Sequence, residues 1–300
     1  MWLILVVLLS LYATVQTLSL FADELATQLA LFAVYALASE FLHMHGSLFY
    51  RAARHSLLAR CVQMLAPVVY TAESRAVMTG LVQSKRQIMF CVAPHGPLCL
   101  GLAVGFGGHC GQMPAELSDR LRIVAHTSVR VIPFVRELAS VFGFISSSRL
   151  SVEAALRQNQ HLALIPAGMA SKTQTLVDRP VPPNAIVVHR ERLGFLALAA
   201  RKNMLVVPVL APDENNLYRL YGTQLGLWPL TLVVGRLLLL PRMKLELHFG
   251  TPIDAGQFKT NLDTLEALYH KQLRQLAPPG YRVEFRQVGD DNRQTNSSLK

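Results

Sequence analysis

Cysteine is scarce in this chain of 300 residues, and the few cysteines form no metal-binding pattern. The four cysteines, Cys61, Cys91, Cys99 and Cys110, include no CxxC pair. A zinc site built on the adjacent His109 and Cys110 is not expected, because a second closely spaced pair of ligands is missing. Three of the cysteines lie in apolar or glycine-rich surroundings, where a reduced thiol packs as a small hydrophobe. The sequence therefore predicts a reducing, cytosol-facing compartment and no metal.

Acidic residues are also few. Lys and Arg number 29 against 19 Asp and Glu, which leaves a formal net charge of +10. This surplus favours anionic partners such as nucleotide phosphates, nucleic acid or an acidic lipid leaflet. Nucleic acid is not expected as a partner, because the basic residues are scattered and no zinc-finger spacing or aromatic-rich ribonucleoprotein motif accompanies them.

Charge is missing altogether from residues 1–20, and residues 26–42 are nearly as apolar. The first stretch has about the ~20 residues that cross a hydrocarbon core of ~30 Å, and the second falls a little short. The connector with Asp23 and Glu24 leaves room only for a tight hairpin. No Lys or Arg precedes Arg51, so the positive-inside rule places the rest of the chain in the cytosol. We expect an N-terminal membrane hairpin.

A cleaved signal peptide is the alternative for the N-terminus. It is not favoured, because the sequence lacks a basic n-region and a good A-x-A site, and a second apolar stretch follows at once. A further apolar run over residues 225–240 contains Trp228, Pro229 and Arg236. This composition suits a segment that lies in the membrane interface or re-enters it. A buried core element explains the run equally well, and the sequence leaves both interpretations open.

The remaining chain alternates short β-rich runs with helical patterns. Strands are predicted over residues 87–92, 122–127, 161–165, 204–210 and 244–249, and helices over residues 134–142, 151–158 and 193–202. Near the end, Asn261 can cap a helix whose leucines and Tyr269 recur at three- and four-residue spacing. This alternation predicts an α/β fold with a central, mainly parallel or mixed sheet flanked by helices.

Three regions follow from this pattern. The membrane hairpin occupies residues 1–45, a cytosol-facing domain occupies residues 46–285, and a polar, disordered tail occupies residues 286–300. The candidate interfacial segment lies within the domain at residues 222–241.

Familiar nucleophile and phosphate motifs are absent. The chain contains no GxSxG nucleophile elbow and no GxxxxGK[ST] loop. Gly101, Gly105, Gly107 and Gly108 fail the dinucleotide-binding spacing, so we expect these glycines to permit close backbone packing.

The most informative stretch chemically is residues 93–101, where a predicted strand runs into a turn and then into an apolar helical pattern. Pro97 suits the first helical turn, so His95 would lie at a helix N-terminus, where the dipole keeps its imidazole neutral. A neutral imidazole can accept the proton of an alcohol that attacks a thioester carbonyl. Free backbone N–H groups of the same turn, which includes Gly96, can stabilise the oxyanion. On this motif alone, a purely structural histidine is an equal alternative.

The turn resembles the His-Pro-His-Gly block of the type 2 diacylglycerol acyltransferase and monoacylglycerol acyltransferase family. The matching residues are Pro94, His95, Gly96 and Gly101. Ala93 takes the place of the first histidine of the block, so this chain does without it. His95 matches the second histidine, which the wider HxxxxD acyltransferases share. Like the family, the chain lacks their aspartate and has Leu100 instead.

Further blocks of the family follow in order. Residues 133–137 resemble its Pro-x-x-Arg-Glu segment, residues 143–149 resemble the stretch that ends in Ser-Arg, and residues 190–195 resemble its Arg-x-Arg-x-Gly-Phe block. Its Glu-Asn-x-x-Tyr pattern is matched by Glu214, Asn215 and Tyr218. The resemblance runs from about residue 87 to residue 270, which is most of the chain after the hairpin.

One departure concerns a carboxylate. The family carries Gly-Gly-x-x-Glu after its central strand, whereas residues 167–171 of this chain are Ala-Gly-Met-Ala-Ser. Ser171 thus replaces the glutamate, whose role is filled by another residue or is absent. The replacement suggests a changed substrate or an inactive relative.

The resemblance implies a lysophospholipid-acyltransferase-like core and acyl-CoA-dependent O-acyltransferase activity. The acceptor would be diacylglycerol, monoacylglycerol or a long-chain alcohol, and acyl-CoA would be a co-substrate with no further cofactor. His95 would deprotonate the acceptor hydroxyl for direct attack on the acyl-CoA carbonyl, without an acyl-enzyme.

Other residues are candidates for substrate contact. Pro94 is expected beside the substrate because it adjoins His95. Glu137 could orient His95 or bind the acceptor, although an ion pair with Arg136 explains it as well. Arg190 and Arg192 suit the CoA phosphates, since guanidinium groups bind phosphate in a bidentate manner. Lys172 is a further phosphate candidate, and a solvated basic face is the alternative for these cations.

Two other functions compete with this interpretation. The first is a lysophospholipid or ether-lipid acyltransferase, and the second is a non-catalytic, membrane-bound lipid-binding protein, which Ala93 and Ser171 favour. The resemblance implies an integral membrane protein, in the endoplasmic reticulum if the source is eukaryotic, with its catalytic domain facing the cytosol. The acceptor, the acyl-chain preference and self-association as a homo-oligomer are left open.

Overall fold

The computed structural model describes part of the chain. The described residues are 30, 32–38, 60, 68–94, 100–107, 112–126, 136, 139–140, 142–166, 185–189, 194–214 and 245–286. All structural statements below concern these residues.

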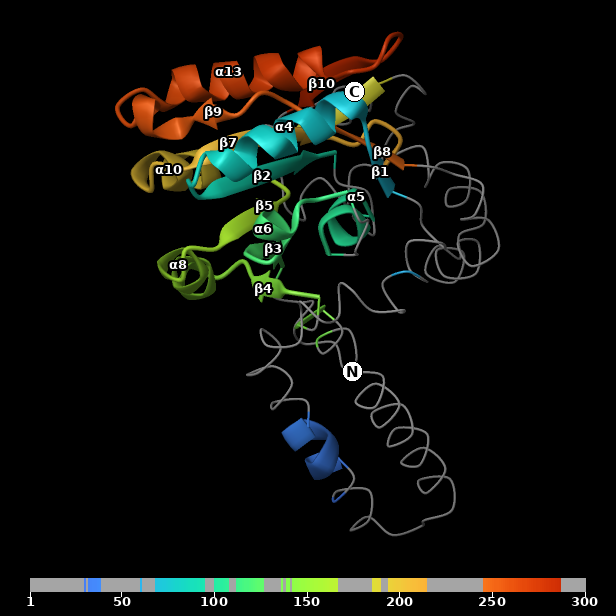
Figure 1. Cartoon of the computed structure of the whole chain (residues 1–300), viewed down its shortest axis with the longest axis vertical. Coiled ribbons are helices and arrows are strands. Elements are labelled where there is room, and N and C mark those ends of the chain that lie inside the picture. Colours follow the sequence, from blue (N-terminus) through green and yellow to red (C-terminus); the bar gives the residue numbers. More distant parts are fainter. Residues whose placement is uncertain are drawn as a thin grey trace, which may run out of the picture.

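A mixed sheet of eight strands forms the centre of the molecule (Figure 1). Its order is β1 (Val68–Tyr70), β8 (Leu245–Phe249), β7 (Leu205–Leu210), β2 (Ile88–Ala93), β5 (His161–Leu164), β3 (Leu121–Ala125) and β4 (Phe144–Ser146), with β9 (Ile253–Asp254) beside β7. Neighbouring strands pair in parallel, including β2 with β7. The exceptions are the pairs β7 with β8 and β7 with β9, which are antiparallel. The predicted mainly parallel or mixed sheet flanked by helices is confirmed.

The central strand β2 explains why the sheet is covered on both faces. All six of its residues are buried, which is typical of a parallel strand between two layers of helices. Ile88, Phe90 and Val92 point into one hydrophobic cluster, whereas Met89, Cys91 and Ala93 point into a second cluster on the other face. Each face therefore has a core of its own.

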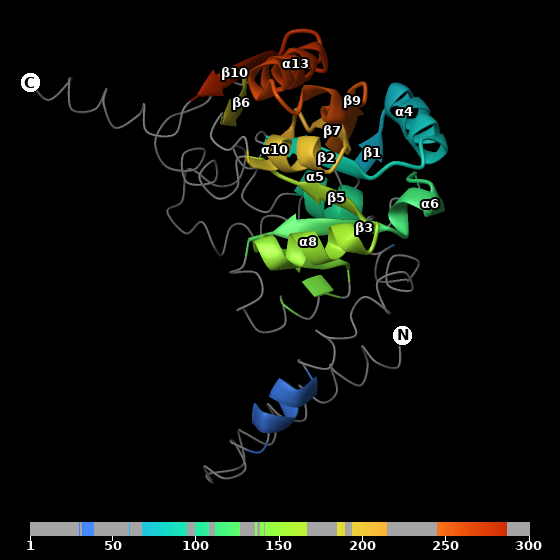
Figure 2. The same cartoon turned by 90° about the vertical axis from the view of Figure 1, so that its left-hand side faces the viewer.

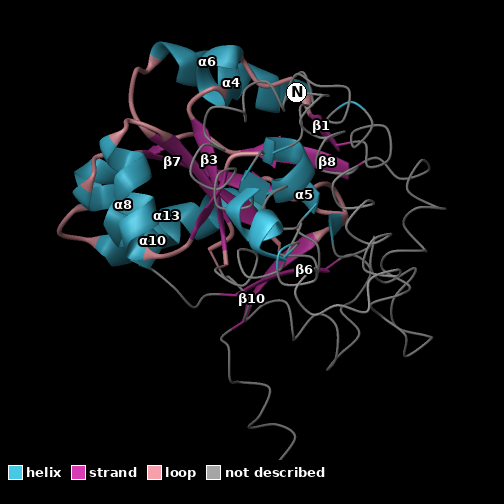
Figure 3. Cartoon of the chain, turned by 90° about the horizontal axis from the view of Figure 1, so that it is seen from below, coloured by secondary structure: helices cyan, strands magenta, loops and turns pink. Residues whose placement is uncertain are grey.

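Two sets of helices cover these cores. The first core is closed by α4 (Ala72–Gln83), by α5 (Leu100–Leu102), which continues into the π-helix η1 (Ala103–Gly107), and by α6 (Ala115–Ser118). The second is closed by α8 (Arg149–Arg157), α10 (Gly194–Arg201), the 3₁₀ helix η4 (Ala255–Phe258) and α13 (Leu262–Gln275). Figure 3 shows α8, α10 and α13 gathered together, apart from α4, α5 and α6.

A smaller sheet lies next to α13. Strand β6 (Ala185–His189) pairs in parallel with β10 (Arg282–Arg286), and Figure 2 shows the pair beside α13. The aromatic ring of Phe285 in β10 lies 4.1 Å from the imidazole of His270 between ring centroids, which joins this sheet to the helix.

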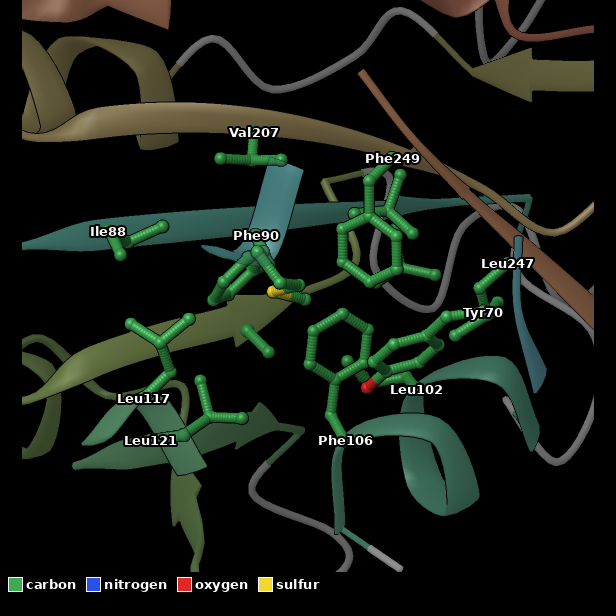
Figure 4. Close-up of a cluster of buried hydrophobic side chains, with 14 of the residues drawn as sticks. Tyr70, Ile88, Phe90, Leu102, Phe106, Leu117, Leu121, Val207, Leu247 and Phe249 are labelled. Carbon is green, nitrogen blue, oxygen red and sulfur yellow. The ribbon is translucent and has the colours of Figure 1, made fainter. Parts of the chain in front are cut away.

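Four aromatic rings gather in the first core (Figure 4). The ring of Phe249 lies 4.9 Å from that of Tyr70, 6.0 Å from that of Phe90 and 5.8 Å from that of Phe106, between centroids. The Tyr70 hydroxyl donates a hydrogen bond of 2.6 Å to the carbonyl oxygen of Gly105. The buried phenol thus has a hydrogen-bond partner in the π-helix η1, and this bond links η1 to β1 of the sheet.

Glycines let α5 and η1 approach the sheet closely. A Cβ atom on Gly105 would lie 2.5 Å from Cδ1 of Leu247, and one on Gly107 would lie 2.9 Å from Cδ1 of Ile123. The expectation that these glycines permit close packing is confirmed for Gly101, Gly105 and Gly107, whereas Gly108 lies outside the described residues.

Most predicted elements are present within a few residues of their expected bounds. This holds for the five predicted strands, for the helices predicted over residues 151–158 and 193–202, and for α13, whose cap Asn261 accepts a hydrogen bond of 3.1 Å from the Thr264 N–H group. The prediction missed β1, α4, α6, β4, β6, β9, η4 and β10. Most of the helix predicted over residues 134–142 lies outside the described residues.

The predicted membrane segments stay predictions. Residues 30 and 32–38 of the hairpin are helical, and the rest of it, together with residues 222–241 and the tail beyond Arg286, lies outside the described residues. Arg286 itself, which the sequence assigned to the tail, ends β10. Among the described helices, none is both long enough and apolar enough to cross a bilayer.

The close contact at Gly105 predicts a loss of stability on substitution. In Gly105→Ala, the new methyl group must displace the fully buried Leu247, which we expect to lower the free energy of unfolding by about 1–3 kcal/mol. Gly80 of α4 is the matched control, because nothing lies within 4 Å of its Cβ position. Gly80→Ala should therefore raise stability by about 0.5–1 kcal/mol. Urea unfolding of the two variants measures both effects, and equal changes would contradict this packing.

His161 predicts a second effect on stability, which depends on pH. Its Nδ1 accepts a hydrogen bond of 3.2 Å from the Ile88 N–H group, and burial together with nearby Arg120 lowers its pKa to about 4. The unfolded chain, with a histidine pKa near 6.5, binds the proton more readily, so the contribution of His161 is present above about pH 6.5 and is lost as the pH falls towards about 4.

The loss should amount to roughly 3 kcal/mol over this window. His161→Asn offers a side-chain oxygen to the same N–H group and does not titrate. Its free energy of unfolding, measured by urea titration across the window, should fall less steeply with pH than that of the wild type. Parallel pH curves for the two proteins would refute this role of His161.

Candidate active site

The strands β2 and β7 end together at one edge of the sheet. They pair in parallel over six residues, from Ile88 opposite Leu205 to Ala93 opposite Leu210. In open parallel sheets, ligands bind beyond the carboxyl ends of the strands. The candidate motif begins at this edge, because the buried Pro94 follows β2 directly through a cis peptide bond.

The strand-turn-helix order expected for the motif is confirmed at its two ends. The strand β2 ends at Ala93, and α5 begins at Leu100. His95 and Gly96 lie among residues 95–99, which are outside the described part of the chain. Glu137, Lys172, Arg190 and Arg192 lie outside it as well, so their predicted roles stay predictions.

A buried glutamate lies at the same edge, and no role was predicted for it from the sequence. Glu214 follows β7 and is only 1% exposed. Its Oε2 accepts a hydrogen bond of 2.8 Å from the backbone N–H group of Gly101 in α5. The match to the Glu-Asn-x-x-Tyr pattern marked this residue, but nothing in the sequence names a partner 113 residues away.

Gly101 packs tightly against the turn after β7. A Cβ atom at Gly101 would lie 3.2 Å from Cβ of Ala211, 3.2 Å from Cδ2 of Leu247 and 3.3 Å from Oε2 of Glu214. Figure 1 shows α5 next to β1 and β8, with which it shares the first core. The absence of a side chain at Gly101 therefore eases the close approach of the helix backbone to the turn after β7.

A histidine on β8 lies near this edge but faces another layer. His248 is opposite Leu210 in the antiparallel pairing, and it alternates with Leu247, which points towards α5. Burial lowers the pKa of His248, against the opposing effect of Glu246, Glu73 and Asp213. The described residues contain no group of three or more His, Cys, Asp or Glu side chains that could hold a metal ion.

A hollow of about 290 Å³ lies at the opposite, amino edge of the sheet and is lined in part by Arg86, Arg120 and His161. Both of these arginines form hydrogen bonds within the fold. Arg86 donates a hydrogen bond of 2.6 Å to Asp254, and Arg120 donates one of 3.0 Å from Nε to the carbonyl oxygen of Asn159. Arginines near the C-termini of helices also complement the helix dipole. Structural roles therefore account for the two arginines of this hollow.

Comparisons with known proteins agree with the motif. The model of the family described as diacylglycerol acyltransferase matches residues 26–236. The chain is similar to diacylglycerol O-acyltransferase 2 of Dictyostelium discoideum, with 26% identity over 73% of this chain and 70% of that protein. It is also similar to human 2-acylglycerol O-acyltransferase 3, with 26% identity over 51% of this chain and 45% of that protein.

Among solved structures, the chain is similar to the 1-acyl-sn-glycerophosphate (LPA) acyltransferase PlsC from Thermotoga maritima. The match has a TM-score of 0.41 and 12% identity, and it covers 91% of this chain and 90% of that one. A likeness at this level carries no further conclusion about this chain.

The fold is α/β, and the match to the family model indicates an enzyme of the O-acyltransferase type. The chain belongs to the diacylglycerol acyltransferase family, as a divergent member of its type 2 and monoacylglycerol acyltransferase branch. The resemblance inferred from the sequence is thereby confirmed.

The contact at Gly101 predicts a measurable loosening of the motif. In Gly101→Ala, the new methyl group pushes against Ala211 and the Glu214 carboxylate, so hydrogen exchange at the amide of residue 101 should accelerate by roughly tenfold. Gly80→Ala, an exposed helical control, should leave that amide unchanged. Hydrogen exchange of the purified variants, followed by mass spectrometry, measures the protection of this amide. Equal protection in both variants would argue against the contact.

Proposed function

We propose that this protein transfers a fatty acyl group from acyl-CoA to a lipid hydroxyl, with His95 as the general base. Membership of the diacylglycerol acyltransferase family supports the reaction type. The observation that carries the proposal is the position of the motif. His95 follows Pro94 at the carboxyl end of the central strand β2, and α5 begins five residues after it, at Leu100.

The chemistry needs one base and one oxyanion site. His95 takes the proton of the acceptor hydroxyl as its oxygen attacks the thioester carbonyl carbon. The ester bond forms, the carbon–sulfur bond breaks, and the proton passes to the CoA thiolate, so that His95 ends neutral. Backbone N–H groups of the turn, including that of Gly96, stabilise the oxyanion.

The remaining candidates bind the substrates. Arg190, Arg192 and Lys172 are proposed to hold the CoA phosphates, since guanidinium and ammonium groups bind phosphate oxygens. Glu137 and Pro94 are proposed to border the acceptor. The formal net charge of +10 favours an anionic nucleotide substrate, and no cofactor beyond acyl-CoA is proposed.

The acceptor is proposed to be a neutral glycerolipid, because the similar proteins are named as diacylglycerol and 2-acylglycerol O-acyltransferases. A membrane location follows from the same proposal. In the helix at residues 32–38, Phe32 is 68% exposed and Leu37 is 72% exposed, which suits contact with lipid. We propose an integral membrane protein of the endoplasmic reticulum whose catalytic domain faces the cytosol.

The test is incorporation of labelled oleoyl-CoA by the purified, detergent-solubilised protein. Diacylglycerol, monoacylglycerol, a long-chain alcohol and a lysophospholipid are offered side by side. We expect a neutral-lipid product that His95→Ala reduces by about 10²-fold or more, because a positioned base contributes at least that factor. His161→Asn is the control histidine substitution, and it should keep wild-type turnover near neutral pH because His161 lies at the other edge of the sheet.

Each other outcome selects a competitor. A lysophospholipid product would favour a phospholipid acyltransferase in place of the neutral-lipid enzyme. A folded wild-type protein with no product that depends on His95 would favour a non-catalytic lipid-binding relative, for which Ala93 and Ser171 are the specific sequence support.

A further inference from the structure

The hollow of about 290 Å³ at the amino edge of the sheet has two polar groups that the fold does not use. Arg86 and Arg120 have structural roles, but Lys85 and His161 line the hollow as well. In the described part of the chain, the Lys85 ammonium group forms no hydrogen bond or ion pair, and Nε2 of His161 forms no hydrogen bond. Both groups are therefore available to a ligand.

His161 is held in one hydrogen-bonding state. The residue is only 2% exposed, and its Nδ1 accepts the bond of 3.2 Å from the Ile88 N–H group. Because burial and nearby Arg120 lower its pKa to about 4, the ring is neutral near pH 7 and its hydrogen lies on Nε2. Nε2 can then donate a hydrogen bond but cannot bind a metal ion. The hollow thus offers a buried donor, which the oxygen of a ligand would satisfy.

The backbone at Lys85 favours another residue type. Lys85 has a φ of 53°, in the left-handed region that non-glycine residues seldom adopt and asparagine adopts more readily. Among the described non-glycine residues, the other two with positive φ are indeed asparagines, Asn159 and Asn203. The turn alone would favour asparagine or glycine at position 85. Lysine there adds a positive charge to the hollow at a cost in backbone conformation.

The ends of the neighbouring helices do not explain the two unused donors. The carbonyl oxygen of Leu81 in α4 accepts a hydrogen bond of 2.8 Å from the Ser84 hydroxyl. That of Leu156 in α8 accepts one of 2.8 Å from Nε2 of Gln87. These C-terminal carbonyl groups therefore have partners of their own.

The charges of the hollow sum to a positive value. Arg86 is paired with Asp254, which leaves the positive charges of Lys85 and Arg120. The lining, as the described residues define it, includes one carboxylate, that of Glu116, and it forms no ion pair there. The hollow therefore favours an anion, and it also has an acceptor for a hydroxyl group.

We propose that this hollow binds a small phosphate ester with a free hydroxyl group, and that Lys85 and His161 hold the phosphate. The ammonium group and the Nε2–H group donate to phosphate oxygens, and the charge of Arg120 adds attraction. Glu116 accepts the hydroxyl of the ester and repels an anion that lacks one. The volume lies at the lower end of the ~300–1,000 Å³ of pockets for drug-sized ligands, so it suits a molecule such as glycerol 3-phosphate and is too small for acyl-CoA.

This site lies at the opposite edge of the sheet from the candidate active site. The strand β2 begins at Ile88, to which His161 is bonded, and ends at Ala93, just before the motif. The phosphate ester is therefore an effector or a stabilising ligand, and the proposal does not depend on the proposed function.

The experiment is isothermal titration calorimetry of the purified protein in a non-ionic detergent, near neutral pH and without phosphate in the buffer. The probes are glycerol 3-phosphate, inorganic phosphate and, as an uncharged control, glycerol. We expect glycerol 3-phosphate to bind with a Kd of about 1 mM or below, inorganic phosphate to bind more weakly and glycerol not to bind. Lys85→Gln should weaken phosphate binding by about tenfold. Lys271→Gln, the same exchange at an exposed lysine of α13 outside the hollow, should match the wild type.

Two further variants test the other groups. His161→Asn keeps an oxygen for the Ile88 N–H group, but its shorter side chain does not reach the position of Nε2, so binding should again weaken by about tenfold. Glu116→Gln removes the repulsion and should strengthen the binding of inorganic phosphate by about threefold, which narrows the preference for the ester. Thermal unfolding confirms that each variant is folded.

Three results would overturn the proposal. The first is a folded wild type that binds neither phosphate compound. The second is equal weakening in Lys85→Gln and Lys271→Gln, which would mean attraction by net charge alone. The third is binding of inorganic phosphate as tight as that of glycerol 3-phosphate, which would contradict the assignment of a hydroxylated ester.

Discussion

The parallel pairing of β2 with β7 is the constraint on which the rest of the structure depends. Because β2 is buried on both faces, its residues alternate between two cores, and its neighbours on both sides run in the same direction. Parallel strands end at a common edge. The motif after β2 and the turn after β7 are therefore brought together by the sheet, although more than 110 residues separate them in the sequence.

The approach of α5 to the sheet is the second constraint. Gly101, Gly105 and Gly107 each lie where a side chain would press against a buried neighbour, so the helix backbone rests almost directly on the sheet. The Tyr70 hydroxyl and the Glu214 carboxylate each bind a backbone group of this helix. Two buried polar side chains thus form hydrogen bonds with the backbone of α5 and η1, the helical segment that follows the motif. This fits a segment whose position matters for chemistry.

Much of the fold could be predicted from the sequence, because its signals are local. The continuous apolar runs of β2 and β7 indicate strands covered on both faces, and the spacing of apolar residues after Asn261 indicates α13. The elements that were missed have weaker local signals. The helix α4 has a polar, weakly periodic sequence, and β1 and β4 have three residues each. Strands this short gain their stability from neighbours across the sheet rather than from their own residues.

The sequence by itself determined the family, the α/β class and the strand-turn-helix order around residues 93–101, because each of these depends on residues that lie close together along the chain. It also drew attention to Glu214 as part of a pattern. Only the tertiary structure decided what Glu214 binds, and that Gly101 packs tightly against Glu214 and Ala211. The physical reason is that a hydrogen bond between residues 101 and 214 depends on the register of β2 and β7 and on the packing of α5, which no local pattern encodes.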